Sequence, residues 1–169
     1  MKKPATNDEL VFLPLGGSGE IGMNLNAYGY GPPDARKWII VDIGVTFGRE
    51  DTTPGVDLIL PDPAYLEEHK DDIIAIVLTH AHEDHIGALG WLWPRLPAPV
   101  YATPFTAALV REKLRERGLL ENSGKMPAAF RPDDHVRIIA DRDRLGVALD
   151  IGDDFDIVIA REHEAFSAF

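Results

Sequence analysis

Apolar and polar residues follow one another in a distinct order between residues 73 and 96. Ile73 to Leu78 is a continuous apolar run rich in β-branched side chains, which predicts a strand buried on both faces. Mostly polar residues follow from 79 to 85. Apolar residues then resume at a helical spacing, at Ile86, Leu89, Trp93 and Leu96. The pattern therefore predicts a buried strand, a short polar turn and a helix over residues 86–96.

Weaker versions of these patterns predict the remaining elements. Strands are expected over 10–15, 25–30, 37–43, 99–102, 135–140 and 156–160, and helices over 63–70 and 104–117. Thr103 can cap the second of these helices and Gly118 can end it. Residues 44–61 show little periodicity and are expected to form a long loop with a short extended piece at 57–60. Alternating strands and helices indicate an α/β layered fold.

The polar turn after residue 78 holds four potential metal ligands, His80, His82, Asp84 and His85. Imidazole and carboxylate groups bind zinc, manganese and iron. His80 and His82 are two apart in an extended segment and can point to one side, whereas Asp84 and His85 follow the bend and can address a second position. One turn can thus hold part of a two-metal site, with metals about 3.5–4 Å apart, that generates hydroxide and binds a phosphoryl group. The alternative is a histidine-rich surface loop. Three of the six histidines lie within six residues at a strand end, which argues against it.

Two further features of the sequence are unusual. Residues 16–22 contain four glycines in seven positions, so the backbone there must turn sharply or approach another group closely. No G-x-x-x-x-G-K-[ST] pattern is present, which disfavours a nucleotide-binding loop and leaves a hairpin turn as the plain alternative. Asp42 ends the apolar run of its strand. It either accepts hydrogen bonds from nearby backbone amides or orients a metal-bound histidine from behind.

These motifs resemble a known family. The sequence His-Ala-His-Glu-Asp-His, His80 to His85, matches the H-x-H-x-D-H signature of the metallo-β-lactamase superfamily, which includes lactamases, glyoxalases, phosphodiesterases and nucleases. Gly-Gly-Ser-Gly-Glu-Ile-Gly-Met-Asn, Gly16 to Asn24, resembles the segment near the start of the ribonuclease J family, in the β-CASP nuclease branch. The stretches 44–61 and 99–104 resemble the same family.

The resemblance implies an αββα sandwich of which residues 1–169 supply the N-terminal half, with the β-CASP and C-terminal regions absent. The complete protein is then expected to hydrolyse RNA phosphodiester bonds, as an exonuclease, an endonuclease or both, and this chain alone is expected to be inactive. Two divalent metal ions are expected, zinc first and manganese as the other choice. RNA is the expected partner, no membrane partner is expected, and a homo-oligomer is compatible with the family.

The resemblance also implies roles for single residues. His80 and His82 would hold one metal, together with His163, which follows the last predicted strand. His163 is followed by Glu-Ala-Phe-Ser, which departs from the family pattern. Asp84 and His85 would serve the second metal and act in catalysis, with Asp84 also handling the proton of the attacking water. Asp42 would lie beside the metals and orient a ligand.

Composition changes this picture in two respects. The net charge of −11 argues against a nucleic-acid substrate, although a carboxylate-lined metal site accounts for part of it. Four basic residues, Arg111, Lys113, Arg115 and Arg117, lie close together, and a solvated helix face is favoured over an RNA contact. The absence of cysteine and of a long apolar run fits a cytoplasmic enzyme.

Two alternatives therefore remain beside the ribonuclease. The first is another hydrolase of the superfamily that acts on a thioester or a lactam. The acidic charge favours it, and the glycine-rich segment opposes it. The second is a catalytically inactive domain that binds a partner.

Overall fold

The structure is a computed structural model that describes residues 7–119, 136–138, 146–150 and 156–160. It divides into two units, residues 1–138 and 139–169, which are treated separately below. The described helices of the first unit are α1 (Ala64–Glu68), the 3₁₀ helix η1 (Lys70–Asp72), α2 (Glu83–Ile86), α3 (Leu89–Leu92) and α4 (Pro104–Glu116). Its described strands are β1 (Glu9–Gly16), β2 (Leu25–Gly31), β3 (Lys37–Val41), β4 (Thr46–Phe47), β5 (Leu58–Ile59), β6 (Ile73–Leu78), β7 (Val100–Ala102) and β8 (Val136–Ile138).

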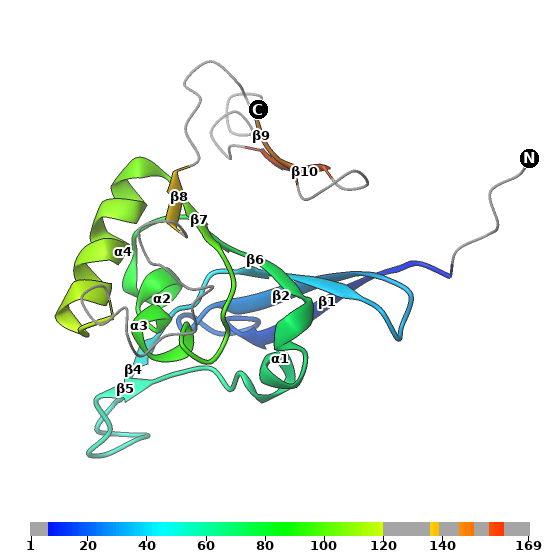
Figure 1. Cartoon of the computed structure of the whole chain (residues 1–169). Helices are drawn as coiled ribbons and strands as arrows, with labels where there is room; N and C mark the ends of the chain where they lie inside the picture. The colour runs from blue at the N-terminus through cyan, green and yellow to red at the C-terminus, as the bar shows by residue number, and fades with distance from the viewer. Residues whose placement is uncertain (1–6, 120–135, 139–145, 151–155, 161–169) are drawn as a thin grey trace, which may run out of the picture. The chain divides into compact units, whose positions relative to one another are not determined.

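The described strands of this unit form one six-stranded sheet in the order β1-β2-β3-β6-β7-β8, and a separate pair, β4 and β5 (Figure 1). Strands β1, β2 and β3 pair antiparallel, whereas β3, β6, β7 and β8 run parallel. The parallel strands are joined by crossover connections that contain helices, the usual arrangement for parallel pairing. This topology confirms the α/β fold.

The main core lies between the helices and one face of the sheet. Strands contribute Leu25, Ala27, Trp38, Ile40, Ile76 and Leu78, and helices contribute Leu89, Leu92, Val110 and Leu114. In β6, Ala75 and Val77 are buried as well as Ile76 and Leu78, which alternate with them. The prediction of a strand buried on both faces is therefore confirmed.

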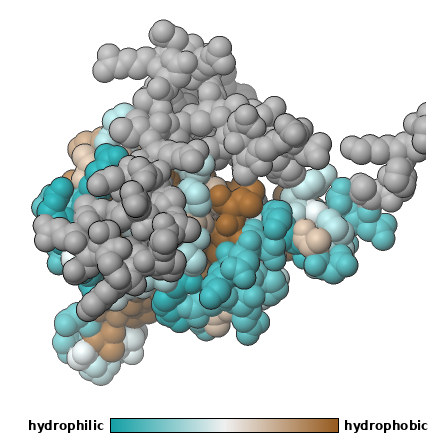
Figure 2. Space-filling view, in the orientation of Figure 1, coloured by the Kyte–Doolittle hydropathy of each residue, from teal (hydrophilic) through white to brown (hydrophobic). Residues whose placement is uncertain are grey.

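Most predicted elements are found with shifted ends. Helix α4 begins after Thr103, whose side chain accepts a hydrogen bond from the backbone N–H of Thr106, and Gly118 follows it with a φ of 65°, as expected. Strand β3 stops at Val41, two residues earlier than predicted. The loop 44–61 contains the pair β4 and β5. On the face drawn in Figure 2 the described surface is mostly hydrophilic, with hydrophobic colour near the centre and at the lower left. In the loop that contains β4 and β5, Phe47 and Val56 are exposed.

The prediction of one helix over 86–96 is wrong. Two short helices, α2 and α3, replace it, and the reason lies in hydrogen bonds from distant segments. The carbonyl of Asp84 accepts from Asn24, and the backbone N–H of Ala88 donates to Ile43 (3.0 Å) instead of reaching back four residues to Asp84. The i to i−4 pattern is therefore interrupted between the two helices.

The second unit contains one described hairpin, in which β9 (Gly146–Asp150) pairs antiparallel with β10 (Asp156–Ala160). Strand β10 was predicted, and β9 was not. In neither unit do the described residues include a helix that is long and apolar enough to cross a membrane.

Candidate metal centre

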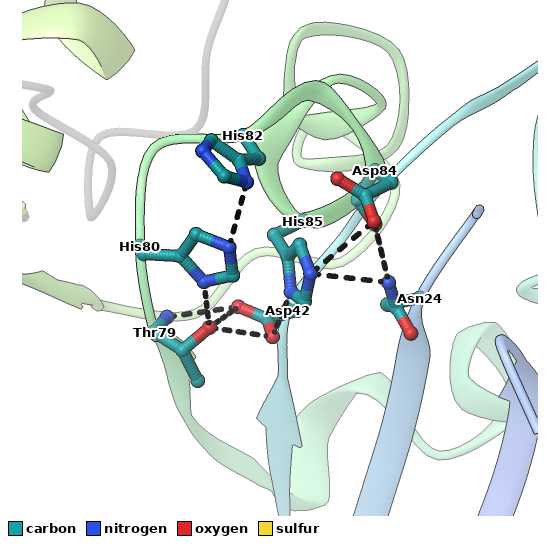
Figure 3. A network of polar contacts seen from close by, with 7 residues as sticks. All are labelled: Asn24, Asp42, Thr79, His80, His82, Asp84 and His85. Atoms are coloured by element: carbon teal, nitrogen blue, oxygen red, sulfur yellow. Dashed lines mark hydrogen bonds and ion pairs between the residues drawn. The ribbon is translucent and has the colours of Figure 1, made fainter. Parts of the chain in front are cut away.

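The candidate ligands lie at the carboxyl edge of the parallel part of the sheet. Strand β6 ends at Leu78, and the chain then turns through His80 and His82 into α2, which carries Asp84 and His85 (Figure 3). Strand β3 runs parallel to β6 and ends beside it. Asp42, which follows β3, is therefore delivered to the same edge, and the topology brings together five of the six predicted site residues.

Asp42 is the most deeply buried of these residues, with 4% of its surface exposed. Its Oδ2 accepts a hydrogen bond from Nδ1 of His85 at 2.7 Å, and its Oδ1 accepts one from the backbone N–H of Thr79 at 2.8 Å. The hydroxyl of Thr79 donates to the same carboxylate. Both contacts considered for Asp42 from the sequence, to a backbone amide and to a histidine, are therefore present.

The backbone of Asp42 has a φ of 65°, in the left-handed region. Aspartate tolerates this conformation better than most residues, although it remains costly. Such strain is concentrated at functional sites. Here it accompanies a carboxylate that is turned toward His85. Because Nδ1 of His85 donates to Asp42, the neutral imidazole presents the lone pair of its Nε2 to the site.

The imidazole of His80 contacts the other two imidazoles. Nε2 of His80 lies 3.1 Å from Nδ1 of His82, and the ring centroids of His80 and His85 are 3.9 Å apart. Burial, followed by the neighbouring His85 and His82, lowers the pKa of His80, against the opposing effect of the Asp42 and Asp84 carboxylates. A lowered pKa favours the neutral imidazole, which is the form that binds a metal.

Asp84 completes the described cluster from the first turn of α2. Its Oδ2 lies 3.3 Å from Nε2 of His85, so the two residues that were expected to share a metal already face each other. Asp84 is partly exposed, which leaves its carboxylate accessible from solvent. The carboxylate can therefore act on a molecule that enters from that side.

Sequence reasoning gave Asn24 no role, yet its side chain belongs to this cluster. Its Nδ2 donates to the backbone carbonyl of Asp84 at 2.9 Å and lies 3.4 Å from Nε2 of His85. The sequence offered one signal for a role of Asn24: it is an amide residue that ends the glycine-rich segment, one residue before a predicted strand. Its distance of 60 residues from Asp84 hid the contact.

These residues fit a divalent metal in their chemistry. The set combines imidazole nitrogens with a carboxylate, and Asp42 orients one imidazole in the manner of outer partners at metal sites. Among the described residues, however, no group of three or more His, Cys, Asp or Glu side chains is arranged to hold an ion. Nε2 of His80 and Nδ1 of His82 lie 3.1 Å apart. This is close to the separation of about 3.3 Å between two nitrogens that bind one tetrahedral zinc with bonds of about 2.0–2.1 Å.

Two other predictions bear on the site. His163 lies outside the described residues, so its role as a ligand stays a prediction. On α4, Lys113 pairs with Glu83 at 2.6 Å, Arg115 pairs with Glu112, and the guanidinium of Arg117 lies over the ring of Trp91. These contacts agree with the helix-face interpretation of the basic residues.

Comparison with known proteins places this geometry in a family. Residues 26–164 match the model of the metallo-beta-lactamase superfamily. The chain is 53% identical over 135 residues to Ribonuclease J of Sinorhizobium meliloti. The matched region covers 79% of this chain and 23% of that protein. It is 40% identical over 141 residues to Ribonuclease J of Thermus thermophilus (78% and 23%) and 47% identical over 114 residues to that of Mycobacterium tuberculosis (67% and 20%). The chain thus spans less than a quarter of the length of these curated relatives. With the motif turn, its carboxylate neighbours and a match over most of its length, the chain belongs to the metallo-beta-lactamase superfamily.

Proposed function

We propose that this chain is part of a metal-dependent ribonuclease that hydrolyses RNA phosphodiester bonds. The observation that carries the proposal is the turn from His80 to His85 together with the 2.7 Å hydrogen bond that orients His85 from Asp42. The relatives named Ribonuclease J supply the substrate class. The proposal includes cleavage from an end of the RNA, cleavage within the RNA, or both.

Membership of the superfamily implies divalent metal ions. We propose two, zinc or manganese, with His80, His82 and His163 around one and Asp84 and His85 around the other. When bound, such metals supply a hydroxide nucleophile and stabilise charge on phosphoryl oxygens. The pairing of imidazole with carboxylate ligands supports both metals as candidates.

The residues of the chain supply the rest of the mechanism. Asp42 keeps the proton of His85 on Nδ1, and so keeps Nε2 available as a ligand. Asp84 presents a partly exposed carboxylate whose Oδ2 can accept the proton released by the attacking water. Thr79 donates two hydrogen bonds to Asp42, which holds that carboxylate in place.

One observation favours a second candidate, a hydrolase that acts on a thioester or a lactam. The net charge of −11 is unfavourable for a polyanionic substrate, and a neutral substrate avoids that repulsion. Against it stand the relatives, whose printed names all specify a ribonuclease. A ribonuclease with RNA as its partner would act in the cytoplasm, and we include that location, and a homo-oligomeric assembly, in the proposal.

The test uses the complete natural protein with labelled single-stranded RNA, a model thioester and a lactam, each in manganese or zinc and with excess chelator. We expect cleavage of RNA alone, and its loss in chelator. His82→Ala serves as the ligand-deficient control. Hydrolysis of the thioester or lactam without RNA cleavage would replace the proposal by the second candidate, and chelator-insensitive RNA cleavage would overturn the metal mechanism.

A further inference from the structure

We propose that Asn24 is a positioning residue for the proposed metal-binding turn, and that Gly17 is glycine because the Asn24 carboxamide occupies the space of its side chain. The inference rests on the proposed function for the identity of the metal ligands. It gives the glycine-rich segment a task other than binding a phosphate.

Asn24 joins the turn through both its main chain and its side chain. Its backbone N–H donates to the carbonyl of Asp84 at 3.0 Å, and its Nδ2 donates to the same oxygen at 2.9 Å. Its own carbonyl accepts from the N–H of Gly44 at 2.8 Å. Asn24 therefore links α2 to the segment that follows Asp42, and connects the two halves of the site.

The turn depends on such outside partners because α2 is only four residues long. A single helical turn is not stable alone in water. Its carbonyls at Glu83 and His85 also accept hydrogen bonds from outside, from the N–H groups of Val45 (3.0 Å) and Ile43 (2.8 Å). Ile43 and Val45 donate to α2 through their backbones. Asn24 donates to the carbonyl of Asp84 through its side chain as well as its backbone. Its side chain can therefore be removed without altering a backbone hydrogen bond directly.

The second N–H of the Asn24 carboxamide faces the ligands themselves. Nδ2 lies 3.5 Å from Oδ2 of Asp84 and 3.4 Å from Nε2 of His85 (Figure 3). Asp42 contacts His85 through the other ring nitrogen. The two side chains therefore contact opposite nitrogens of this imidazole. Asn24 sets the position of Asp84 relative to His85, and Asp42 sets the orientation of the ring.

The glycine-rich loop packs directly on this amide. A Cβ at Gly17 would lie 2.1 Å from Oδ1 of Asn24, whereas a Cβ at Gly19 would meet nothing within 4 Å. Both glycines have a φ of 82°. Alanine should therefore introduce similar backbone strain at either position, and the two substitutions differ in whether the new methyl group displaces Asn24. The four glycines in seven residues predicted either a sharp turn or a close approach to another group. The contact of Gly17 with Asn24 is such a close approach.

The experiment compares metal affinity in the complete protein for wild type, Asn24→Ala, Asn24→Asp, Gly17→Ala and Gly19→Ala. Cobalt(II) and zinc are titrated against a chelator, and the visible absorption of the cobalt form records ligand geometry. Asn24→Asp keeps the size of the side chain and removes both N–H donors. We expect affinity to fall about 10- to 100-fold in both Asn24 variants and in Gly17→Ala, the range for lost outer partners of metal ligands. Gly19→Ala should stay within about twofold of wild type, and the cobalt spectrum should shift only in the first three.

Wild-type affinity and an unchanged cobalt spectrum in Asn24→Asp would overturn the inference, as would equal effects of Gly17→Ala and Gly19→Ala. Circular dichroism checks that each variant is folded, and the two glycine variants decide the matter if Asn24→Ala is not. RNA cleavage is measured separately. Normal metal binding that depends on Asn24 without RNA cleavage would contradict the proposed substrate and support the inference, whereas a wild-type protein that binds no metal would overturn both.

Discussion

Asp42 and His85 are 43 residues apart in the sequence and share a 2.7 Å hydrogen bond at the carboxyl edge of two parallel strands. The bond joins the largely buried carboxylate to Nδ1 of the imidazole. It fixes which nitrogen of His85 faces the site, because the nitrogen that carries the donated proton cannot also bind a metal. A proposed ligand and the residue that orients it are therefore brought together by strand pairing rather than by closeness in sequence.

Replacing Asp42 by Asn should weaken metal binding while the fold is kept. Asparagine tolerates the left-handed backbone about as well as aspartate and can still accept from Thr79, but it carries no charge to hold the Nδ1 proton of His85. We expect a loss of about 10- to 100-fold in zinc affinity, measured by competition with a chelator. Affinity equal to that of wild type would show that the carboxylate supports the backbone only.

In the complete protein, replacing His82 by Ala should abolish the proposed RNA cleavage with little effect on stability. His82 is exposed and lies on a turn, so its removal leaves the core intact. We expect activity to fall by more than about 100-fold, since losing a direct ligand should exceed the loss of an outer partner. His69→Ala is the matched control, because His69 stacks on Tyr65 and donates to its carbonyl, away from the motif turn. Retained turnover in folded His82→Ala would remove His82 from the ligand set.

The fold could be predicted where the determining interactions are local. The apolar run of β6 and the Thr103 cap of α4 each follow from a few adjacent residues. The motif turn was found for the same reason, because its candidate ligands lie within six residues. Asp42 also stood out in the sequence, since a carboxylate that ends an apolar run is unusual, although its burial was not predicted.

The features that the sequence did not reveal depend on distant partners. The break between α2 and α3 arises because Asn24 and Ile43 provide the hydrogen bonds that a continuous helix would make internally. The left-handed φ of Asp42 and the packing of Gly17 on Asn24 arise in the same way. Strand β9 was missed because residues 146–150 form a short run without the clear pattern of the strands in the first unit.

Two tryptophans on α3 and directly after it should differ sharply in their contribution to stability. Trp93 is fully buried and donates from Nε1 to the carbonyl of Ala98 at 3.0 Å, whereas Trp91 is 37% exposed beneath Arg117. We expect Trp93→Ala to lower the free energy of unfolding by about 3–5 kcal/mol. Trp91→Ala should cost less, about 1–2 kcal/mol, because the ring is only partly covered and its cation–π contact adds about 0.5–1 kcal/mol to that burial. Urea denaturation measures both, and similar losses would contradict the register of α3.

Variants of Lys113 test whether the basic face of α4 contacts RNA. The Lys113 ammonium pairs with Glu83 at 2.6 Å, and the two side chains are 30% and 49% exposed, so the pair should contribute about 0–1 kcal/mol to stability. If this ion pair is its only task, Lys113→Met and Glu83→Gln should have similar small effects on unfolding, and the double variant should cost no more than either.

RNA affinity and its dependence on salt should then be unchanged in Lys113→Met, because no phosphate contact is lost. A lysine that contacts phosphate would instead reduce the slope of log affinity against log salt by about 1 when removed. The discriminating measurement is therefore RNA binding by the two single variants across a salt series. A loss of slope in Lys113→Met that Glu83→Gln does not share would assign this face of α4 to the substrate.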